Sequence, residues 1–497
     1  MVPGRLRARR RSAPHRRDPG TVEGIDVLEP WLTRELETVP RYDRFPTVDE
    51  INDSLTKLAA DRPDITTWRR VGTSRLGEPL WCLTVGDGAR HAIVGAMPHP
   101  NEPIGGHTVI HLATRLCEDA GLRKATGYTW HLVACLDPDG TRLNEGWFAG
   151  PFTKTHYGRH FYRPAGDEQV EWTFPFAYKD AYFDRVMPET LALMRLIDET
   201  RPAFLTTLHN SEIGGAFFYL NRPAPGVHGV LQELARRYDV PLYAGEPEHP
   251  TVRMLDKAIF RTPDMREVYD YTERLGQDPS LVVAGGASDS YAARYGTLCL
   301  TAELPYWMDP AAGDRTPTDT SYRELLRRQA AGLREIAEEL SGVLDAIRDD
   351  VVSDSPFLRA SRFFAPLIAV NAETGEQRAA DPGCDRPATI AEVRSALDLV
   401  HSHRLRFGGM LLRALEGELA IGNGTPRIRQ RAASFAEVYA TWCAEAESAT
   451  PDETIPIGHL VAIQYGSILA CAAEAARGAG GDGAGRARSD GDPQVRR

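Results

Sequence analysis

Four short stretches of the sequence place histidine or acidic side chains next to strand-like runs. The first is MPHPNEPIGG, residues 97–106, where His99 and Glu102 stand three residues apart between an apolar run and a helix-like stretch. A strand-to-helix turn can aim both side chains at one point, as two of the three protein ligands of a catalytic zinc must be. The same spacing is also typical of an ordinary polar turn in which Asn101 caps the helix.

The second stretch is FLTTLHNSEIGGAFFY, residues 204–219, in which His209 ends a predicted strand. Ligands of α/β sheets usually bind at the carboxyl ends of the strands. His209 would therefore complete a His/Glu/His set that leaves one coordination position open. Taken alone, such a residue is more often a hydrogen-bonded histidine at a strand end. Asn210, which follows it, is a candidate substrate contact.

The third stretch is TLCLTAELPYW, residues 297–307, which places Glu303 inside an apolar run. A carboxylate there is costly unless it is paired, protonated or functional. In a zinc site, Glu303 would act as general base toward the water that the zinc activates. The structural alternative is a carboxylate paired with a neighbouring arginine such as Arg294.

The fourth stretch, VACLDPDGTRLNEGWF at residues 133–148, ends a predicted strand in the turn sequence Asp-Pro-Asp-Gly. Proline sets φ in such a turn and glycine allows a positive φ. Arg142 and Asn144 follow the turn, and Asn144 is a second candidate substrate contact.

In this order, the four stretches resemble the motifs of the zinc carboxypeptidase family, and the chain resembles a divergent bacterial-type member over about residues 45–345. That family has an HxxE ligand pair, an NPDG turn, a later histidine ligand and a catalytic glutamate near the last core strand. The resemblance implies an α/β fold with a mixed, twisted eight-stranded sheet flanked by helices. It also implies one Zn²⁺ per chain held by His99, Glu102 and His209, with Glu303 activating water and later protonating the leaving amine.

Two further roles follow from the same resemblance. GGASDS, residues 285–290, resembles a Gly-Gly-Ser-x-Asp stretch of the family, which would place Asp289 in the wall of the specificity pocket. The family also uses an arginine after the NPDG turn to stabilise the oxyanion, and the candidates here are Arg142, Arg159 and Arg163. Arg163 is the first choice, since it lies in the dense polar and aromatic stretch GRHFYRP.

The sequence departs from the family pattern where an Asn-Arg pair should bind the terminal carboxylate of the substrate. The nearest stretch, QVEWTFPF, puts Glu171 and Trp172 at these positions. Neither residue supplies the fixed fork of donors with which arginine binds a carboxylate. Arg159, Arg163 or Arg142 would then have to bind a free carboxylate, or an amine of the substrate would pair with Glu171.

Three functions fit these residues. The first is a zinc-dependent peptidase or amidase that acts on a peptide or peptide-like metabolite. The second is a deacylase of a small N-acyl amino acid, like the related desuccinylases and aspartoacylases, which a compact pocket with several arginines would favour. The third is a non-catalytic binding protein on the same fold, which the loss of a ligand or of Glu303 would favour; all four residues are present.

The composition of the chain indicates the class of protein and its cellular compartment. The 497 residues are 42% hydrophobic and 26% charged with a net charge of −11, so we expect a globular protein that does not bind nucleic acid. No run of about 18 apolar residues is evident, so we expect no membrane span. The seven cysteines are scattered without a CxxC pair, which favours free thiols and a cytoplasmic location.

The order of elements predicts a layered α/β domain over residues 40–350 and a mainly helical region over 356–475. We expect a disordered basic arm at 1–25 and a disordered tail at 477–497. The predicted strands are Leu80–Val85, His91–Ala96, Tyr128–Cys135, Phe204–His209, Ala216–Leu220 and Leu298–Leu304. The predicted helices are Thr47–Arg62, Gly105–Asp119, Pro188–Thr200, Gly226–Tyr238, Tyr322–Asp349, Ala391–His401, Phe407–Leu419 and Ser434–Glu447.

Overall fold

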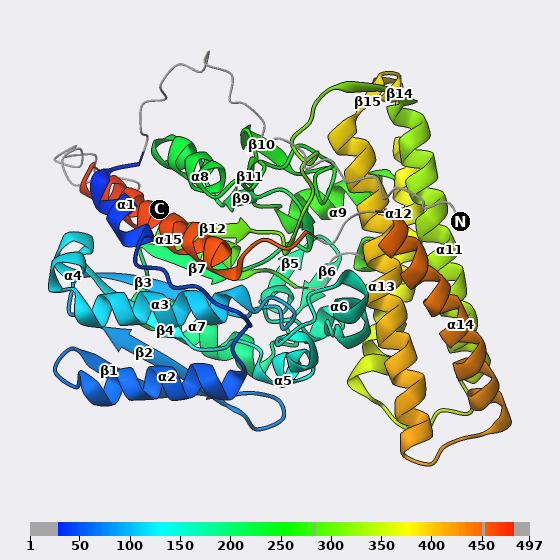
Figure 1. Ribbon diagram of the computed structural model, residues 1–497, viewed down its shortest axis with the longest axis horizontal. Helices are drawn as coiled ribbons and strands as arrows, with labels where there is room; N and C mark the ends of the chain where they lie inside the picture. Colours follow the sequence, from blue (N-terminus) through cyan, green and yellow to red (C-terminus); the bar gives the residue numbers. More distant parts are fainter. Residues whose placement is uncertain (1–27, 282–284, 450–452, 482–497) are drawn as a thin grey trace, which may run out of the picture.

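A mixed nine-stranded sheet, one strand larger than expected, forms the centre of the computed structural model, which describes residues 28–281, 285–449 and 453–481 (Figure 1). The strand order is β1-β2-β4-β3-β7-β12-β9-β11-β10. The bounds are β1 Thr66–Thr73, β2 Pro79–Val85, β3 Arg90–Ala96, β4 Tyr128–Val133, β7 Phe204–Leu208, β9 Phe217–Leu220, β10 Arg253–Asp256, β11 Ile259–Arg261 and β12 Leu298–Glu303.

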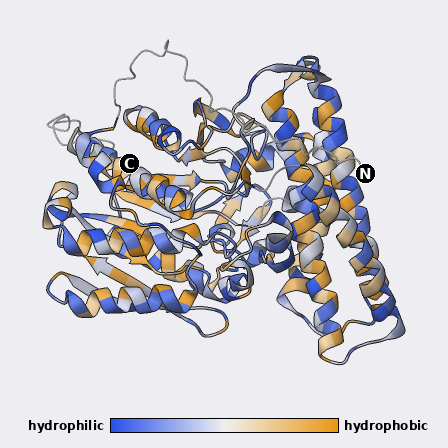
Figure 2. Ribbon diagram, viewed as in Figure 1, coloured by the Kyte–Doolittle hydropathy of each residue, from blue (hydrophilic) through white to orange (hydrophobic). Residues whose placement is uncertain are grey.

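The middle of the sheet consists of four neighbouring parallel strands, β4, β3, β7 and β12. Their sequences are nearly continuous apolar runs, because helices cover both faces of a parallel sheet. Figure 2 shows these strands as the hydrophobic centre of the molecule. Sequence patterns located them to within two residues at each end.

Sequence patterns did not identify three strands near the sheet edges, β1, β10 and β11. β1 and β10 carry arginine, threonine and aspartate, and all their side chains are at least partly exposed. β11 has only three residues. Neither a short strand nor a polar edge strand produces the apolar run that marks a buried strand.

Helices cover both faces of the sheet. On one face α2 (Val48–Asp61), α3 (Ile104–Glu118), α15 (Ile457–Gly481) and α8 (Pro225–Arg237) pack side by side in that order (Figure 1). The other face packs on α7 (Pro188–Thr200) and forms a second, smaller core. The short helices are α1 Pro30–Leu36, α4 Ala120–Thr126, α5 Pro138–Arg142, α6 Lys154–His160, α9 Met265–Arg274 and α10 Ser288–Ala292.

The capping box predicted at Thr47 and Glu50 is present at the start of α2. At α2, the Thr47 side chain accepts a hydrogen bond from the Glu50 N–H, and the Glu50 side chain accepts one from the Thr47 N–H. This reciprocal capping box satisfies two backbone donors that the helix itself leaves unpaired.

The remaining strands form three small two-stranded sheets: β5 Phe176–Tyr178 with β6 Ala181–Phe183, β8 Ile213–Gly214 with β13 Trp307–Met308, and β14 Pro317–Ser321 with β15 Pro387–Thr389.

A group of four long helices stands beside the sheet (Figure 1): α11 Tyr322–Ile347, α12 Pro356–Arg378, α13 Ile390–Ala420 and α14 Pro426–Ala449. We call it the helical wall. Helix α13 replaces two separately predicted helices, because residues 402–406 between them contain neither glycine nor proline and continue the turn. Helix α13 packs on α6 and so joins the wall to the sheet.

The last helix, α15, does not belong to the helical wall. It returns to the sheet, where it packs on α3, α8, β7 and β12. By length and composition, residues 457–478 could cross a membrane, but 78% of the most apolar window is buried in the protein. Helix α15 continues to Gly481, so residues 477–481 are helical and not part of a disordered tail. The expected arm at 1–25 and the rest of that tail lie outside the described residues.

All seven cysteines lie within the described residues and are free thiols, as expected, and only Cys443 is more than marginally exposed.

We predict that Ile463→Ala lowers the free energy of unfolding by about 2–5 kcal/mol, because the Ile463 side chain of α15 is fully buried. Urea unfolding followed by circular dichroism measures this change. Arg477→Ala, at an exposed position of the same helix, should change stability by no more than about 0.5 kcal/mol. Equal effects of the two substitutions would contradict the packing of α15 described here.

Candidate active site

Three neighbouring strands of the sheet, β3, β7 and β12, end at the same edge and carry the predicted chemistry there. His99 and Glu102 follow β3, His209 follows β7, and Glu303 is the last residue of β12. Parallel strands bring their carboxyl ends together, so residues up to 204 positions apart meet at one edge. The turn after β3 begins at Met97, whose φ of 51° is strained for a residue with a side chain.

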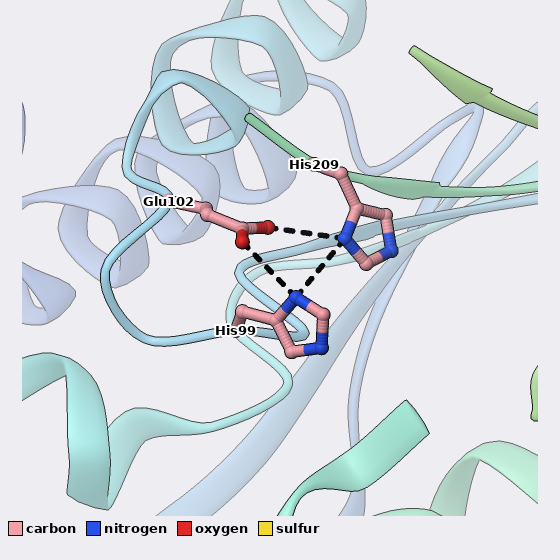
Figure 3. Close-up of side chains that lie close together, drawn as sticks. All are labelled: His99, Glu102 and His209. Carbon is pink, nitrogen blue, oxygen red and sulfur yellow. Dashed lines mark hydrogen bonds and ion pairs between the residues drawn. The ribbon is translucent and has the colours of Figure 1, made fainter. Parts of the chain in front are cut away.

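The side chains of His99, Glu102 and His209 converge on one point (Figure 3). His99 Nδ1 lies 3.0 Å from Glu102 Oε1, and His209 Nδ1 lies 3.0 Å from Glu102 Oε2. The two Nδ1 atoms are 3.2 Å apart. All three side chains are buried, so the cluster is shielded from bulk water.

Electrostatics favour the forms of these side chains that bind a metal. Burial, followed by the charge of Arg163, lowers the pKa of His99 to about 3, so its ring is neutral near pH 7. Burial alone would raise the pKa of Glu102, but the charges and hydrogen bonds of His99 and His209 lower it below its usual range. The cluster therefore offers a neutral imidazole and a carboxylate.

The residues present fit a zinc ion. Two ring nitrogens and a carboxylate form one of the common donor sets of catalytic zinc, with a fourth position left for water or substrate. The two Nδ1 atoms and the carboxylate oxygens of Glu102 approach one another to 3.0–3.2 Å. Groups this close need a cation or a shared proton between them. The second ring nitrogen of His209 lies 3.0 Å from Thr207 Oγ1, a contact that orients the ring as partners of metal-bound histidines do.

Glu303 lies beside the cluster with its carboxylate held by no other side chain. Among the described residues, none forms a hydrogen bond or ion pair with this carboxylate, although the residue is only 9% exposed. Burial, followed by the charges of Glu248 and Glu102, raises the pKa of Glu303 well above its usual range. The alternative partner Arg294 instead packs its guanidinium over the ring of Tyr291, 3.6 Å from the centroid. An uncommitted buried carboxylate of this kind suits a general base.

Of the three candidate arginines, Arg163 alone contacts the cluster. Its Nη1 donates to Glu102 Oε1 at 2.9 Å, and its Nε donates to Gln169 at 2.8 Å. The other two do not lie at the cluster in the structure, because other carboxylates bind them. Arg142 pairs with Asp49 and Glu78 at 2.7 and 2.8 Å, and Arg159 pairs with Glu416 of the helical wall at 2.6 Å.

Comparison with known proteins identifies this arrangement. The family model of the zinc carboxypeptidases matches residues 51–309, which is more than half of the chain and contains all four residues at the sheet edge. The chain belongs to the zinc carboxypeptidase family. The members of this family are zinc-dependent hydrolases, and the expected family and fold class are confirmed.

The individual relatives of this chain are distant. An uncharacterized protein of Zymomonas mobilis is 23% identical over 245 residues, or 48% of this chain, and the match spans only about half of that relative, 54%. Carboxypeptidase A of Helicoverpa armigera is 15% identical over 70% of this chain and 78% of its own, with a TM-score of 0.37. A metallo-carboxypeptidase of Burkholderia cenocepacia is 16% identical over 67% and 70%, with a TM-score of 0.33.

Three predicted substrate contacts bind other parts of the protein in the structure. The amide of Asn144 is buried and bonds to the backbone of Gly140 and Tyr162. Both carboxylate oxygens of Glu171 accept hydrogen bonds from Ser288, at 2.8 Å each, so Glu171 holds a loop and is not available to a substrate amine. Arg159 is likewise paired with Glu416, so all three side chains bind other parts of the protein in the structure, as polar groups in folded proteins usually do.

Asp289 also differs from its predicted role. It lines a separate cavity of about 360 Å³, together with Phe174 and Arg261, and not the larger cavity beside the cluster. Burial, followed by the charge of Glu171, raises the pKa of Asp289 to about 6. The resemblance to the family in this stretch therefore does not carry over to the specificity pocket.

Of the remaining predicted substrate contacts, Trp172 lines the larger cavity, whereas Asn210 is buried and is not part of its lining. The guanidinium carbon of Arg163 lies 5.9 Å from the centroid of the Trp172 ring. Trp172 lines a cavity of about 560 Å³. Asn210 uses Oδ1 to accept hydrogen bonds from Ile104 N–H and Tyr306 Oη, while its buried Nδ2 has no partner. Ser211 and Glu212, which follow Asn210 in the chain, line this cavity.

Two residues that support the cluster were not predicted from the sequence. Tyr306 Oη donates to the backbone oxygen of Asn101 and so ties the β12 end to the turn that carries His99. Gln464 of α15 donates to the backbone oxygen of His209 at 2.9 Å and accepts from Thr108. Tyr306 lies three residues after Glu303 and could have been considered. Gln464 lies 255 residues from His209, and no local pattern marks it.

We predict that the purified protein binds about one zinc ion per chain and that His209→Ala abolishes this binding, because it removes one of three ligands. Glu303→Gln should keep the zinc, since Glu303 makes no contact with the cluster in the structure. Metal analysis of dialysed protein measures both. His160→Ala, a histidine outside the cluster, serves as the control and should bind as the parent does. Retention of zinc by His209→Ala would refute this ligand set.

Proposed function

We propose that this protein is a zinc-dependent hydrolase of an amide or peptide bond in a peptide or peptide-like molecule. The observation that supports this most directly is the position of Glu303. It stands as an uncommitted buried carboxylate next to a His/Glu/His cluster, and the lining of a cavity of about 560 Å³ includes Ser211 and Glu212, which follow His209 closely in the chain. Membership in the zinc carboxypeptidase family supports the same reaction class.

Zinc, when bound, supplies a Lewis acid that polarises the scissile carbonyl and increases the acidity of water. The residues of this chain do the rest. The Glu303 carboxylate takes the proton of the attacking water and returns it to the leaving nitrogen, which avoids expulsion of an amide anion. The Arg163 guanidinium, next to the cluster, offers N–H groups to the oxygen that becomes negative. Trp172 fixes the guanidinium from one side.

The cavity favours a peptide-like substrate over a small N-acyl amino acid. Pockets for drug-sized molecules have volumes of about 300–1,000 Å³, so about 560 Å³ accommodates several residues. A deacylase of acidic substrates would need an arginine free to bind a carboxylate. The three arginines that line the cavity, Arg378, Arg394 and Arg406, are all paired with carboxylates.

The setting of the reaction is a second proposal. Seven free thiols are stable in a reducing compartment, which supports a cytoplasmic location.

We predict hydrolysis of amide-linked peptides that is lost on treatment with a chelator and restored by zinc. Glu303→Gln should lower kcat by about 10²–10⁴-fold while the protein keeps its zinc, because a general base contributes a factor of this size. The assay follows the release of new amino groups from a panel of short peptides, C-terminally amidated peptides and N-acyl amino acids. Cleavage of N-acyl amino acids alone would favour the deacylase, and no cleavage by the zinc-loaded protein would favour a binding protein.

Arginine substitutions test the oxyanion assignment separately. We predict that Arg163→Ala lowers kcat by about 10²–10³-fold, as removal of one oxyanion donor does in other hydrolases. Arg159→Ala, which removes an arginine only four positions earlier, should leave kcat within about twofold, since Arg159 pairs with the helical wall. Zinc content must be measured in both variants, because Arg163 also contacts Glu102. Equal kcat values for the two zinc-loaded variants would exclude the role of Arg163.

A further inference from the structure

The cavity next to the cluster lies between the sheet and the helical wall. The loop around residues 246–250 and strand β9 form one side, and helices α11, α12 and α13 form the other. The helical wall thus contributes directly to the space that a substrate would occupy. The charges on this lining can be accounted for residue by residue.

Each arginine of the lining is neutralised by one carboxylate of the same lining. Arg406 bonds to Glu212 at 2.6 Å, Arg394 to Asp309 at 2.7 Å and Arg378 to Glu246 at 3.0 Å. The Glu246 carboxylate also accepts a hydrogen bond from Tyr322. These three pairs contribute no net charge to the cavity.

Two carboxylates of the lining form no ion pair with any residue that the structure describes. Glu248, an exposed side chain on the loop, accepts a hydrogen bond from Tyr219 Oη at 2.9 Å but forms no ion pair with another described residue. Asp398, on α13, is only 7% exposed, and its Oδ1 is buried without any hydrogen-bond partner. A buried carboxylate oxygen without a donor is costly, and it becomes stable when a ligand brings a donor or a positive charge.

Other nearby groups compensate these two carboxylates only in part: burial raises the pKa of Glu248 although the charge of Arg163 acts to lower it. Burial lowers the pKa of His249 to about 4 and that of His403 to about 3, so both lining histidines are neutral near pH 7. Lys154 and Arg394 are close enough to lower the pKa of Asp398, but burial outweighs them and raises it to about 6. Neither forms an ion pair with Asp398, which stays mostly ionised at pH 7.

Aromatic rings surround the same space. The Phe217 ring packs against those of Tyr219, Tyr243 and Phe260, with ring centroids 5.3–6.1 Å apart, and all four residues line the cavity. Aromatic faces attract cations through their quadrupole, and the attraction grows as the site excludes water. Carboxylates without partners among aromatic rings are the usual surroundings of a bound ammonium or guanidinium group.

We propose that this cavity binds a cationic group of the substrate, an ammonium or guanidinium, with Glu248 and Asp398 as its counter-charges. The proposal rests on the proposed function and specifies its substrate class: peptides or amides with a basic side chain or amine. It is consistent with the absence of a free arginine in the lining, since nothing there would hold a terminal carboxylate. The helical wall, through Asp398, determines this preference.

Two probes that differ only in the charge of the side chain test the proposal. They are Nα-acetyl-lysine methylamide and its uncharged counterpart, Nα-acetyl-norleucine methylamide. Binding of each to the zinc-loaded protein is measured by calorimetry at pH 7 and low salt. We expect the lysine probe to bind at least about tenfold more tightly, and Glu248→Gln and Asp398→Asn each to reduce this ratio at least about threefold. Binding of the norleucine probe should change little in either variant.

Glu437→Gln is the matched control, because it removes a carboxylate from an exposed position of α14 outside the cavity lining. It should leave the ratio unchanged. Equal binding of the two probes to the parent, or a ratio that neither cavity variant alters, would overturn the proposal. Binding requires no turnover, so a preference for lysine without any hydrolysis would refute the proposed function alone. Hydrolysis of neutral and basic peptides at equal rates would refute the cation site alone.

Discussion

A buried carboxylate needs compensation, and this requirement governs the site and its surroundings. Glu102 is buried at the sheet edge and receives contacts from His99, His209 and Arg163. None of these groups is optional, because an ionised carboxylate in such a place without partners would cost several kcal/mol. The turn after β3, the end of β7 and the loop that carries Arg163 are therefore all fixed with respect to one another through Glu102. Zinc binding uses the negative charge that this arrangement preserves.

Supporting contacts extend this constraint through the molecule. Tyr306 connects the end of β12 to the turn that holds His99 and to Asn210 beside His209. Thr207 sets the ring of His209, and Gln464 binds the backbone of the same residue. A site held from several elements at once keeps its geometry without rearrangement during the reaction, which is the condition for effective electrostatic catalysis.

The sequence was sufficient to predict those parts of the protein in which a residue type has a single physical role, as apolar residues have in a buried strand. The apolar runs of β3, β7 and β12 located the core strands, and the polar residues at their ends located the ligands and Glu303. Arg142, Asn144 and Glu171 bind elsewhere in the structure for one reason: a polar residue near a motif can serve the fold as well as the substrate. Only the residues that each side chain contacts in the folded protein decide between these roles. The contacted residues, Asp49, Tyr162 and Ser288, are either distant in sequence or of types that mark no motif. The cavity carboxylates Glu248 and Asp398 share no sequence motif, since two different elements bring them to one space.

Helix α15 has a consequence for the order in which the protein matures. Its Gln464 reaches the backbone of His209 across 255 residues, and its apolar side chains fill the space between α3 and α8. During synthesis, at roughly 5–20 residues per second, the strands and the ligands leave the ribosome well before this helix does. The nascent chain then exposes an apolar sheet face for many seconds, a state that chaperones recognise. The hydrolytic centre is completed only when the last helix docks, so an unfinished chain carries the ligands but not the finished site.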